Sequence, residues 1–241
     1  MKIKYIHDAT VYNMMSAQKI VPFLISNFKI SSVVDIGCGT GTWLRAFADE
    51  GFEDFLGIDG PHLDKRKLII PEEKVLLLDL EKPFEVGRKF DLAISLEVAE
   101  HLELKVAQQF VACLANLSDV VLFSAAIPYQ GGQNHVNEQW QGYWIDMFRQ
   151  LGFISVDIIR PVFWNDQSVE FWYRQNIILF VKNSALDVKL LSLPSFHSFN
   201  IVHPELYNKK SALLLKIQRG EGGIILSIKT LIKSFVYALK R

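Results

Sequence analysis

An acid followed by three alternating glycines is the feature of this chain with the clearest chemical meaning. The segment Val33–Leu44 reads VVDIGCGTGTWL, so an apolar run ends in Asp35, and Gly37, Gly39 and Gly41 follow before a stretch typical of a helix. Glycine permits a positive φ and lets a ligand approach the backbone, and the first turn of a helix offers free N–H groups. This combination predicts a nucleotide-like ligand at the carboxyl end of a strand.

The position of the acid distinguishes between classes of nucleotide. A dinucleotide-binding fingerprint reads G-x-G-x-x-G, whereas here the third glycine place holds Thr42. A carboxylate two residues before the first glycine, as Asp35 is, repels a pyrophosphate and attracts an amino group. The motif D-I-G-C-G-T-G resembles motif I of the class I S-adenosylmethionine (SAM)-dependent methyltransferases. The resemblance covers residues 30–183 and implies that this loop holds the methionine part of SAM.

Two further acids end apolar runs. The first, Asp59, lies where a nucleotide-binding βαβ unit has its ribose-binding acid, and a carboxylate accepts hydrogen bonds from both ribose hydroxyls. For the second run, 75–80, the resemblance implies that Asp79 binds the adenine amino group and Leu80 contacts the ring. A role for Asp79 in capping a turn is the alternative. The full predicted cofactor site consists of Asp35, Gly37, Cys38, Gly39, Gly41, Asp59, Gly60, Asp79, Leu80, Ser95 and Leu96.

The segment E-V-A-E-H supplies a second group of chemically active side chains, Glu97, Glu100 and His101. Residues three and four apart share one face of a helix, so a helical turn would bring the three together. Two carboxylates and an imidazole can bind a divalent cation or act as an acid–base group.

The pattern E-x-x-E-H resembles the ubiquinone-pathway O-methyltransferases and the small-RNA 3′-terminal 2′-O-methyltransferases, in which it binds Mg²⁺. His135 matches the later histidine of the RNA enzymes. Three interpretations stay open for Glu97, Glu100, His101 and His135: ligands of Mg²⁺, catalytic residues without a metal, or structural groups that stabilise a helix dipole and donate hydrogen bonds.

The elements that must position these residues alternate between strand and helix. Apolar runs predict strands at 33–36, 54–59, 75–80, 90–95, 120–124, 153–159 and 176–181. Amphipathic patterns predict helices at 10–28, 42–50, 104–117 and 138–151. This order predicts a Rossmann-like α/β fold, a seven-stranded mainly parallel sheet with helices on both faces. The family resemblance adds that the last strand is antiparallel.

The rest of the chain exceeds what the sheet needs. We expect a methyltransferase domain over residues 1–183, with the first helix included, and a C-terminal helical appendage over residues 184–241. Its end, 224–241, is an apolar and basic helix candidate. Such a helix can lie on an anionic membrane or pack on a partner. Docking on its own domain or on a second subunit, as a dimer contact, is favoured over both.

Composition narrows the partners and the compartment. The chain has 26 basic and 26 acidic residues, so it has no overall positive field for nucleic acid, and we expect a small-molecule or glycan substrate. The two cysteines, Cys38 and Cys113, form no disulfide framework and indicate a reducing compartment. No secretory signal or spanning run is evident, which predicts a cytoplasmic enzyme, at the inner face of the membrane if the last helix binds lipid.

Aromatic and polar side chains mix in two late segments, HVNEQWQGYW at 135–144 and WNDQSVEFWYRQN at 164–176. They resemble uncharacterised methyltransferases found beside polysaccharide-biosynthesis enzymes, and we expect the second to form a substrate loop. For Trp140 and Trp144, packing on the sheet is favoured over contact with a sugar. We predict methyl transfer from SAM to a hydroxyl of a sugar or glycan precursor, with Mg²⁺ as an optional assistant. The alternatives are an N-methyltransferase for an aminosugar or small amine, and a non-catalytic SAM-binding partner protein.

Overall fold

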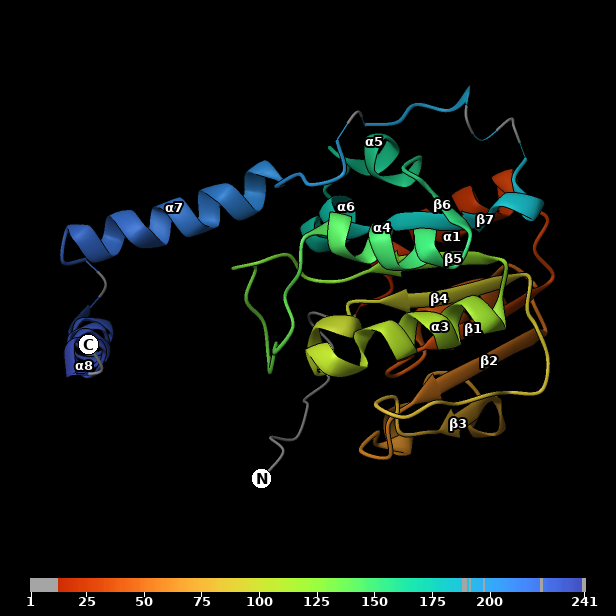
Figure 1. Cartoon of the computed structure of the whole chain (residues 1–241), viewed down its shortest axis with the longest axis horizontal. Coiled ribbons are helices and arrows are strands. Elements are labelled where there is room, and N and C mark those ends of the chain that lie inside the picture. Colours follow the sequence, from red (N-terminus) through yellow and green to blue (C-terminus); the bar gives the residue numbers. More distant parts are fainter. Residues whose placement is uncertain (1–12, 188–189, 191, 197, 222, 240–241) are drawn as a thin grey trace. The chain divides into compact units, whose positions relative to one another are not determined.

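The computed structural model describes residues 13–187, 190, 192–196, 198–221 and 223–239 (Figure 1). These belong to two compact units, Met1–Ile201 and Val202–Arg241, which we describe separately. The predicted start of the first helix, at residues 10–12, lies outside the described residues.

A seven-stranded sheet forms the centre of the first unit, in the order β3-β2-β1-β4-β5-β7-β6. Its strands are β1 Ser32–Ile36, β2 Asp54–Asp59, β3 Val75–Leu77, β4 Leu92–Leu96, β5 Val120–Ser124, β6 Phe153–Val156 and β7 Ile178–Lys182. All pairings are parallel except those of β7, which runs antiparallel to β5 and β6. The predicted fold class and the antiparallel last strand are therefore confirmed.

Helices cover both faces of the sheet. They are α1 Met15–Asn27, α2 Thr42–Asp49, α3 Ala107–Leu117, α4 Gln141–Gln150, α5 Ile159–Phe163 and α6 Phe171–Asn176. Short 3₁₀ turns lie at Lys65–Lys67, Glu72–Lys74, Ala99–His101, Leu104–Val106 and Asn183–Ala185. Side chains of α1, α2 and α5 pack on one face, and those of α3 and α4 pack on the other.

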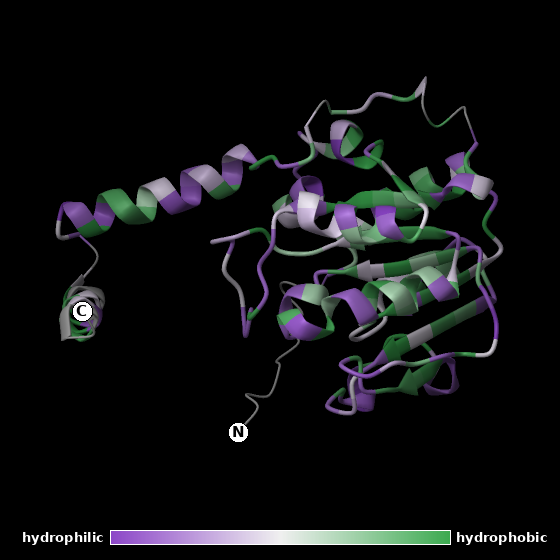
Figure 2. Ribbon diagram, in the orientation of Figure 1, coloured by the Kyte–Doolittle hydropathy of each residue, from purple (hydrophilic) through white to green (hydrophobic). Residues whose placement is uncertain are grey.

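Successive residues of the buried strands contribute in turn to two cores, one on each face of the sheet. Val33 contributes to the core under α1 and α2, whereas its neighbour Val34 contributes to the core under α3 and α4. Strands covered on both faces read as continuous apolar runs, which is why their sequences were recognisable. Figure 2 shows the hydrophobic residues concentrated on these strands.

Two predicted boundaries differ in the later part of the unit. The predicted strand 153–159 ends at Val156, and Ile159 begins helix α5. The predicted substrate loop between the last two strands contains a second helix, α6, which extends through Asn176, so β7 starts at Ile178 rather than at residue 176. Apolar composition alone does not distinguish a buried short helix from a buried strand.

The first unit extends beyond the boundary at residue 183 that the sequence predicts. The buried Arg160 donates a hydrogen bond of 2.9 Å from Nη1 to the carbonyl of Phe199. Gly142 donates its N–H to the side-chain oxygen of Asn200 at 2.8 Å. These contacts attach the segment up to Ile201 to the sheet domain.

The second unit contains two helices, α7 Pro204–Gln218 and α8 Gly223–Leu239. His203 caps the start of α7, where its Nδ1 accepts a hydrogen bond of 3.2 Å from the N–H of Glu205. Among the described helices, none combines the length and the apolar character needed to cross a bilayer.

Candidate functional site

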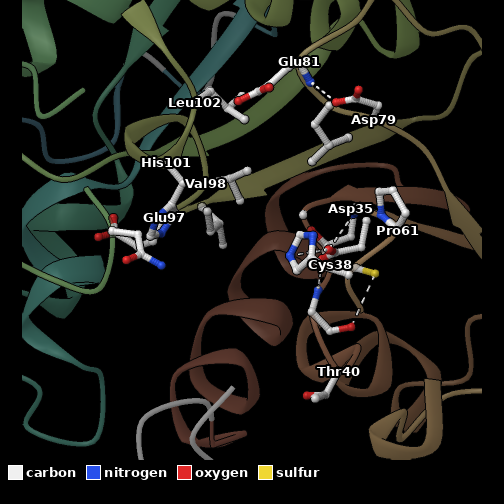
Figure 3. A pocket seen from close by; sticks show the side chains of 18 of the residues that line it. Asp35, Cys38, Thr40, Pro61, Asp79, Glu81, Glu97, Val98, His101 and Leu102 are labelled. Atoms are coloured by element: carbon white, nitrogen blue, oxygen red, sulfur yellow. Dashed lines mark hydrogen bonds and ion pairs between the residues drawn. The ribbon is translucent and has the colours of Figure 1, made fainter. Parts of the chain in front are cut away.

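A cavity of about 1050 Å³ opens at the carboxyl ends of the central parallel strands (Figure 3). This is the edge of an open α/β sheet at which ligands bind, and the volume suits a nucleotide-sized molecule. Of the predicted cofactor residues, those that line it are Asp35, Gly37, Cys38, Gly39, Asp59, Gly60, Asp79, Leu80 and Leu96.

Two predicted cofactor residues do not line the cavity. Ser95 is fully buried within β4. Gly41 starts helix α2 at φ +88°, and a Cβ there would lie 2.6 Å from Cγ1 of Ile70. Gly41 therefore shapes the loop and the start of the helix, and it is not a surface of the cavity.

Asp59 holds the glycine loop in place. Its Oδ2 accepts a hydrogen bond of 2.7 Å from the N–H of Gly39, and its Oδ1 accepts one of 2.6 Å from the N–H of Gly60. Gly37 has φ +81°, and a Cβ on it would lie 2.3 Å from Cγ2 of Val98. The second strand-end acid thus fixes the loop that follows the first, and each of its oxygens retains a lone pair for a ligand hydroxyl.

Asp35 is a buried carboxyl that faces the cavity. Its Oδ2 has no hydrogen-bond partner among the described residues. Burial, and then the negative charge of Asp59, raises the pKa of Asp35 to about 8. A cationic group in the cavity would lower this pKa again and favour the ionised carboxylate, as expected for a carboxylate that meets an ammonium group.

Asp79 has the turn-capping role that the sequence left as an alternative. Its Oδ1 accepts a hydrogen bond of 3.1 Å from the N–H of Glu81, and its Oδ2 lies 3.2 Å from Nζ of Lys82. Asp79 and Leu80 also line the cavity, so contact with an adenine stays a prediction compatible with this position.

The predicted group of Glu97, Glu100 and His101 lies on a turn that differs from the helical turn expected. Strand β4 ends at Leu96, Glu97 adopts φ +56°, and a 3₁₀ turn follows at Ala99–His101. This left-handed residue replaces the α-helical turn that the spacing predicts. The donor atoms of Glu100, His101 and His135 all lie within 4.8 Å of one another.

Residues with a strained backbone lie around this group of side chains. Three non-glycine residues in the described chain have positive φ: Glu97, Tyr129 and Asn134. Glu97 and Asn134 line the cavity, and Tyr129 donates its N–H to Glu138, the partner of His135. Such conformations cost free energy and are retained where the surrounding structure imposes them, which is common at active sites.

Glu97 is held by carboxamides. Nδ2 of Asn176 donates to Oε1 of Glu97 at 3.0 Å, and Nε2 of Gln130 donates to Oε2 at 2.9 Å. The two amides are linked, because Oε1 of Gln130 accepts from Asn176 at 2.9 Å and from Gln175 at 3.0 Å. Gln175 and Asn176 end the motif W-Y-x-Q-N of the segment 164–176, but no role was predicted for them. No pattern in the sequence pointed to Gln130.

Glu97 and His101 line the cavity, whereas Glu100 lies fully buried behind them. Burial raises the pKa of Glu97, an effect opposed by the amide donors and by His135. Burial and then the charge of Glu97 raise the pKa of Glu100 well above its usual value. Of the two carboxyl groups, Glu100 therefore holds a proton more readily than Glu97 does.

The two histidines meet edge to face, with ring centroids 4.9 Å apart. Burial, and then the charge of His135, lowers the pKa of His101 to about 4, so His101 is neutral at pH 7. Nδ1 of His135 lies 2.9 Å from Oε1 of Glu138, which orients this second ring.

A divalent cation bound here would have one carboxyl group and two imidazoles as its protein ligands. Both oxygens of Glu100 are buried without a hydrogen-bond partner among the described residues. The donor set of Glu100, His101 and His135 fits a transition metal better than Mg²⁺, which prefers oxygen ligands. Glu97, which the sequence also offered as a ligand, lies outside this donor set, and each of its oxygens accepts a hydrogen bond from an amide group.

Packing on the sheet, which the sequence favoured for both tryptophans of the segment 135–144, is found for one of them only. Trp144 is buried, with its ring centroid 5.2 Å from that of Phe123, so it packs on the sheet. Trp140 is 41% exposed and does not pack in the core. Tyr173, from the predicted substrate loop 164–176, and Trp43, which had no predicted role, line the cavity with ring centroids 5.3 Å apart.

This geometry agrees with the comparison with known families. Residues 12–157 match the family model described as "Methyltransferase domain". The chain belongs to this family and is a class I SAM-dependent methyltransferase, an enzyme rather than a non-catalytic SAM-binding partner. A comparison with curated proteins gives no match.

Solved structures share the fold at low sequence identity. The sugar N-methyltransferase KedS8 from Streptoalloteichus sp. ATCC 53650 is 14% identical with a TM-score of 0.57, and the match covers 76% of this chain and 94% of that one. The SAM-bound amino pentose methyltransferase CalS10 from Micromonospora echinaspora is 13% identical with a TM-score of 0.52, covering 76% and 100%. The SAH-bound magnesium protoporphyrin IX methyltransferase from Synechocystis PCC 6803 is 17% identical with a TM-score of 0.51, covering 70% and 83%.

Proposed function

We propose that this enzyme transfers the methyl group of SAM to a hydroxyl of a sugar or glycan precursor. The observation that carries the proposal is the pairing of a carboxyl group, Glu97, with an imidazole that is neutral at pH 7, His101, on the wall of the cofactor cavity. Both groups accept hydrogen bonds from hydroxyl groups.

SAM supplies an activated methyl group on a sulfonium, and the chain's own residues align and deprotonate the acceptor. In our proposal Asp35 binds the ammonium group of SAM and Asp59 binds its ribose. Glu97 then accepts a hydrogen bond from a neighbouring hydroxyl of the sugar and so holds the acceptor oxygen in line with the methyl group. His101 takes up the proton of the acceptor hydroxyl as the new C–O bond forms and the methyl–sulfur bond of SAM breaks. A weak base suffices, because a hydroxyl that has gained a methyl group is strongly acidic.

A divalent cation on Glu100, His101 and His135 is the optional part of the proposal. When bound, the cation would polarise the acceptor hydroxyl. His101 would then be a ligand and not the base, so the two versions differ in their response to chelation. Full turnover after EDTA treatment would support His101 as the base. Loss of turnover that Mn²⁺ or Mg²⁺ restores would support the metal.

An amine is the second candidate acceptor, and one observation favours it. The cavity wall carries the carboxyl group of Glu97, whose ionised form would bind the ammonium form of an aminosugar before its proton is lost. The product atom distinguishes the two candidates, because O-methyl and N-methyl groups give different carbon shifts in NMR spectra.

The test is transfer of tritiated methyl from SAM to a panel of nucleotide sugars, lipid-linked glycans, the matching aminosugars and short RNAs. We expect label in a sugar with a free hydroxyl and none in RNA. Glu97→Gln should reduce turnover and leave SAM affinity unchanged, whereas Asp35→Asn should weaken SAM binding. Label only in amines would replace the proposal by the second candidate.

A further inference from the structure

The neutral charge of the chain conceals two oppositely charged units. Residues 202–241 contain eight Lys and Arg against two Asp and Glu, which gives a formal charge of +6. Because the whole chain sums to zero, residues 1–201 carry −6. Such an asymmetry between parts of a chain indicates that the basic part meets an anionic partner.

Helix α8 displays a continuous exposed apolar face. Ile224 is 79% exposed, Leu231 71% and Phe235 66%, and Ile228 and Ile232 are also exposed. At 100° per residue these five fall within an arc of about 100°, which Val236 widens to about 140°. Solvent exposure of so many large apolar side chains on one helix marks a surface that another phase or molecule covers.

The charges of α8 border this face. Lys229 and Lys233 lie next to the apolar arc, and the segment 223–239 contains no Asp or Glu. Thr230 and Ser234 lie beyond the other edge of the arc by their spacing. An apolar arc with cations along one edge and small polar residues beyond the other is a pattern of a helix that lies in a membrane interface.

We propose that the second unit docks the enzyme on an anionic lipid surface through α8. The described helices are unable to span a bilayer, so α8 would lie in the plane of the interface. A second copy fits less well as the occupant, because two units of charge +6 repel each other and the cores of protein interfaces are depleted in lysine. This inference goes beyond the proposed function and does not depend on which acceptor is methylated.

The test is flotation of the full chain with vesicles of phosphatidylcholine, alone or mixed with phosphatidylglycerol. We expect binding to the mixed vesicles only, and weaker binding when salt rises from about 0.1 M to about 0.5 M, since salt screens the lysines. Leu231→Ser with Phe235→Ser should lower binding at least tenfold. Lys229→Gln with Lys233→Gln should lower it severalfold.

Matched variants in the first unit keep the test specific. Val162→Ser removes an apolar side chain that is 46% exposed on α5, and Lys29→Gln with Lys67→Gln removes two exposed cations. These controls should bind vesicles like the parent chain. Calorimetry with SAM should show that the first unit of every variant is folded, and circular dichroism that the helix content of the parent chain is kept. The proposal is overturned if the parent chain ignores anionic vesicles or if the α8 variants bind as well as the controls. Light scattering that shows a dimer lost in the α8 variants, without vesicle binding, would assign the surface to a second copy.

Discussion

The ionisation of Asp35 links SAM binding to pH. Its pKa is about 8 without a ligand, because burial and the charge of Asp59 favour the neutral carboxyl. SAM brings an ammonium group that favours the carboxylate, so below pH 8 binding must release a proton. We expect the affinity for SAH, which has the same ammonium group, to rise about tenfold per pH unit from pH 6 toward pH 8. Calorimetry in buffers of different ionisation enthalpy measures both the affinity and the released proton.

Asp35→Asn is the matched variant for this prediction, because it preserves shape and removes the ionisation. Its affinity for SAH should be lower and nearly independent of pH. The stability of the ligand-free chain has the opposite dependence. A carboxyl whose pKa is raised from 3.8 to about 8 stabilises the fold fully at low pH and loses that contribution as pH rises through 8. A Tm that does not respond to the variant at any pH would contradict the raised pKa.

The carboxamides around Glu97 should act on turnover through its charge. Asn176→Ala removes the donor to Oε1 and should raise the pKa of Glu97, because the amide hydrogen bond favours the anion. We expect turnover to fall by about tenfold, the usual scale for a lost hydrogen bond to a charged group, with KM for SAM unchanged. The acid limb of the pH–rate profile should move to higher pH. Asn183→Ala, an exposed amide after β7, is the control.

At the scale of elements, sequence reasoning succeeded where apolar runs end at the carboxyl edge of the sheet. Asp35 and Asp59 follow buried runs, and both reach the cavity because parallel strands bring their carboxyl ends to one edge. The left-handed turn at Glu97 was not predictable, because φ +56° in a non-glycine residue is imposed by tertiary contacts. The network of Gln130 and Asn176 joins residues 46 apart, which no local pattern reveals.

The residues at the start of helix α5 explain why the predicted strand 153–159 extended too far. Asp157 and Arg160 form a fully buried ion pair where the apolar pattern predicts that the strand continues. Arg160→Ala would leave the carboxyl of Asp157 buried and unpaired, so we expect a loss of about 3–5 kcal/mol in the free energy of unfolding. Urea denaturation measures it. Replacing both residues with apolar ones, Asp157→Leu with Arg160→Met, should recover part of the loss, and a double variant worse than the single one would contradict the role of the unpaired charge.

At the scale of the whole molecule, total charge was a misleading summary. The zero sum made a charged partner look unnecessary, yet it divides into −6 and +6 at the boundary between the two units. The sequence contains this partition, but the boundary that reveals it comes from the fold. The predicted helix at 224–241 was close to α8 Gly223–Leu239, because its apolar spacing is regular.

The two units make a joint prediction about acceptors. If α8 holds the enzyme at an anionic surface, a lipid-linked acceptor in the same vesicle is concentrated around the active site, whereas a water-soluble acceptor with the same sugar is not. Lys229→Gln with Lys233→Gln should therefore lower the rate with the lipid-linked acceptor severalfold and leave the rate with the soluble one unchanged. Raising the salt concentration should have the same selective effect on the parent chain, because screening weakens the attraction of the lysines to the lipid. Initial rates with tritiated SAM on vesicles with and without phosphatidylglycerol measure this difference. Equal losses with both acceptors would mean that α8 supports the fold or the active site, and not the encounter with the membrane.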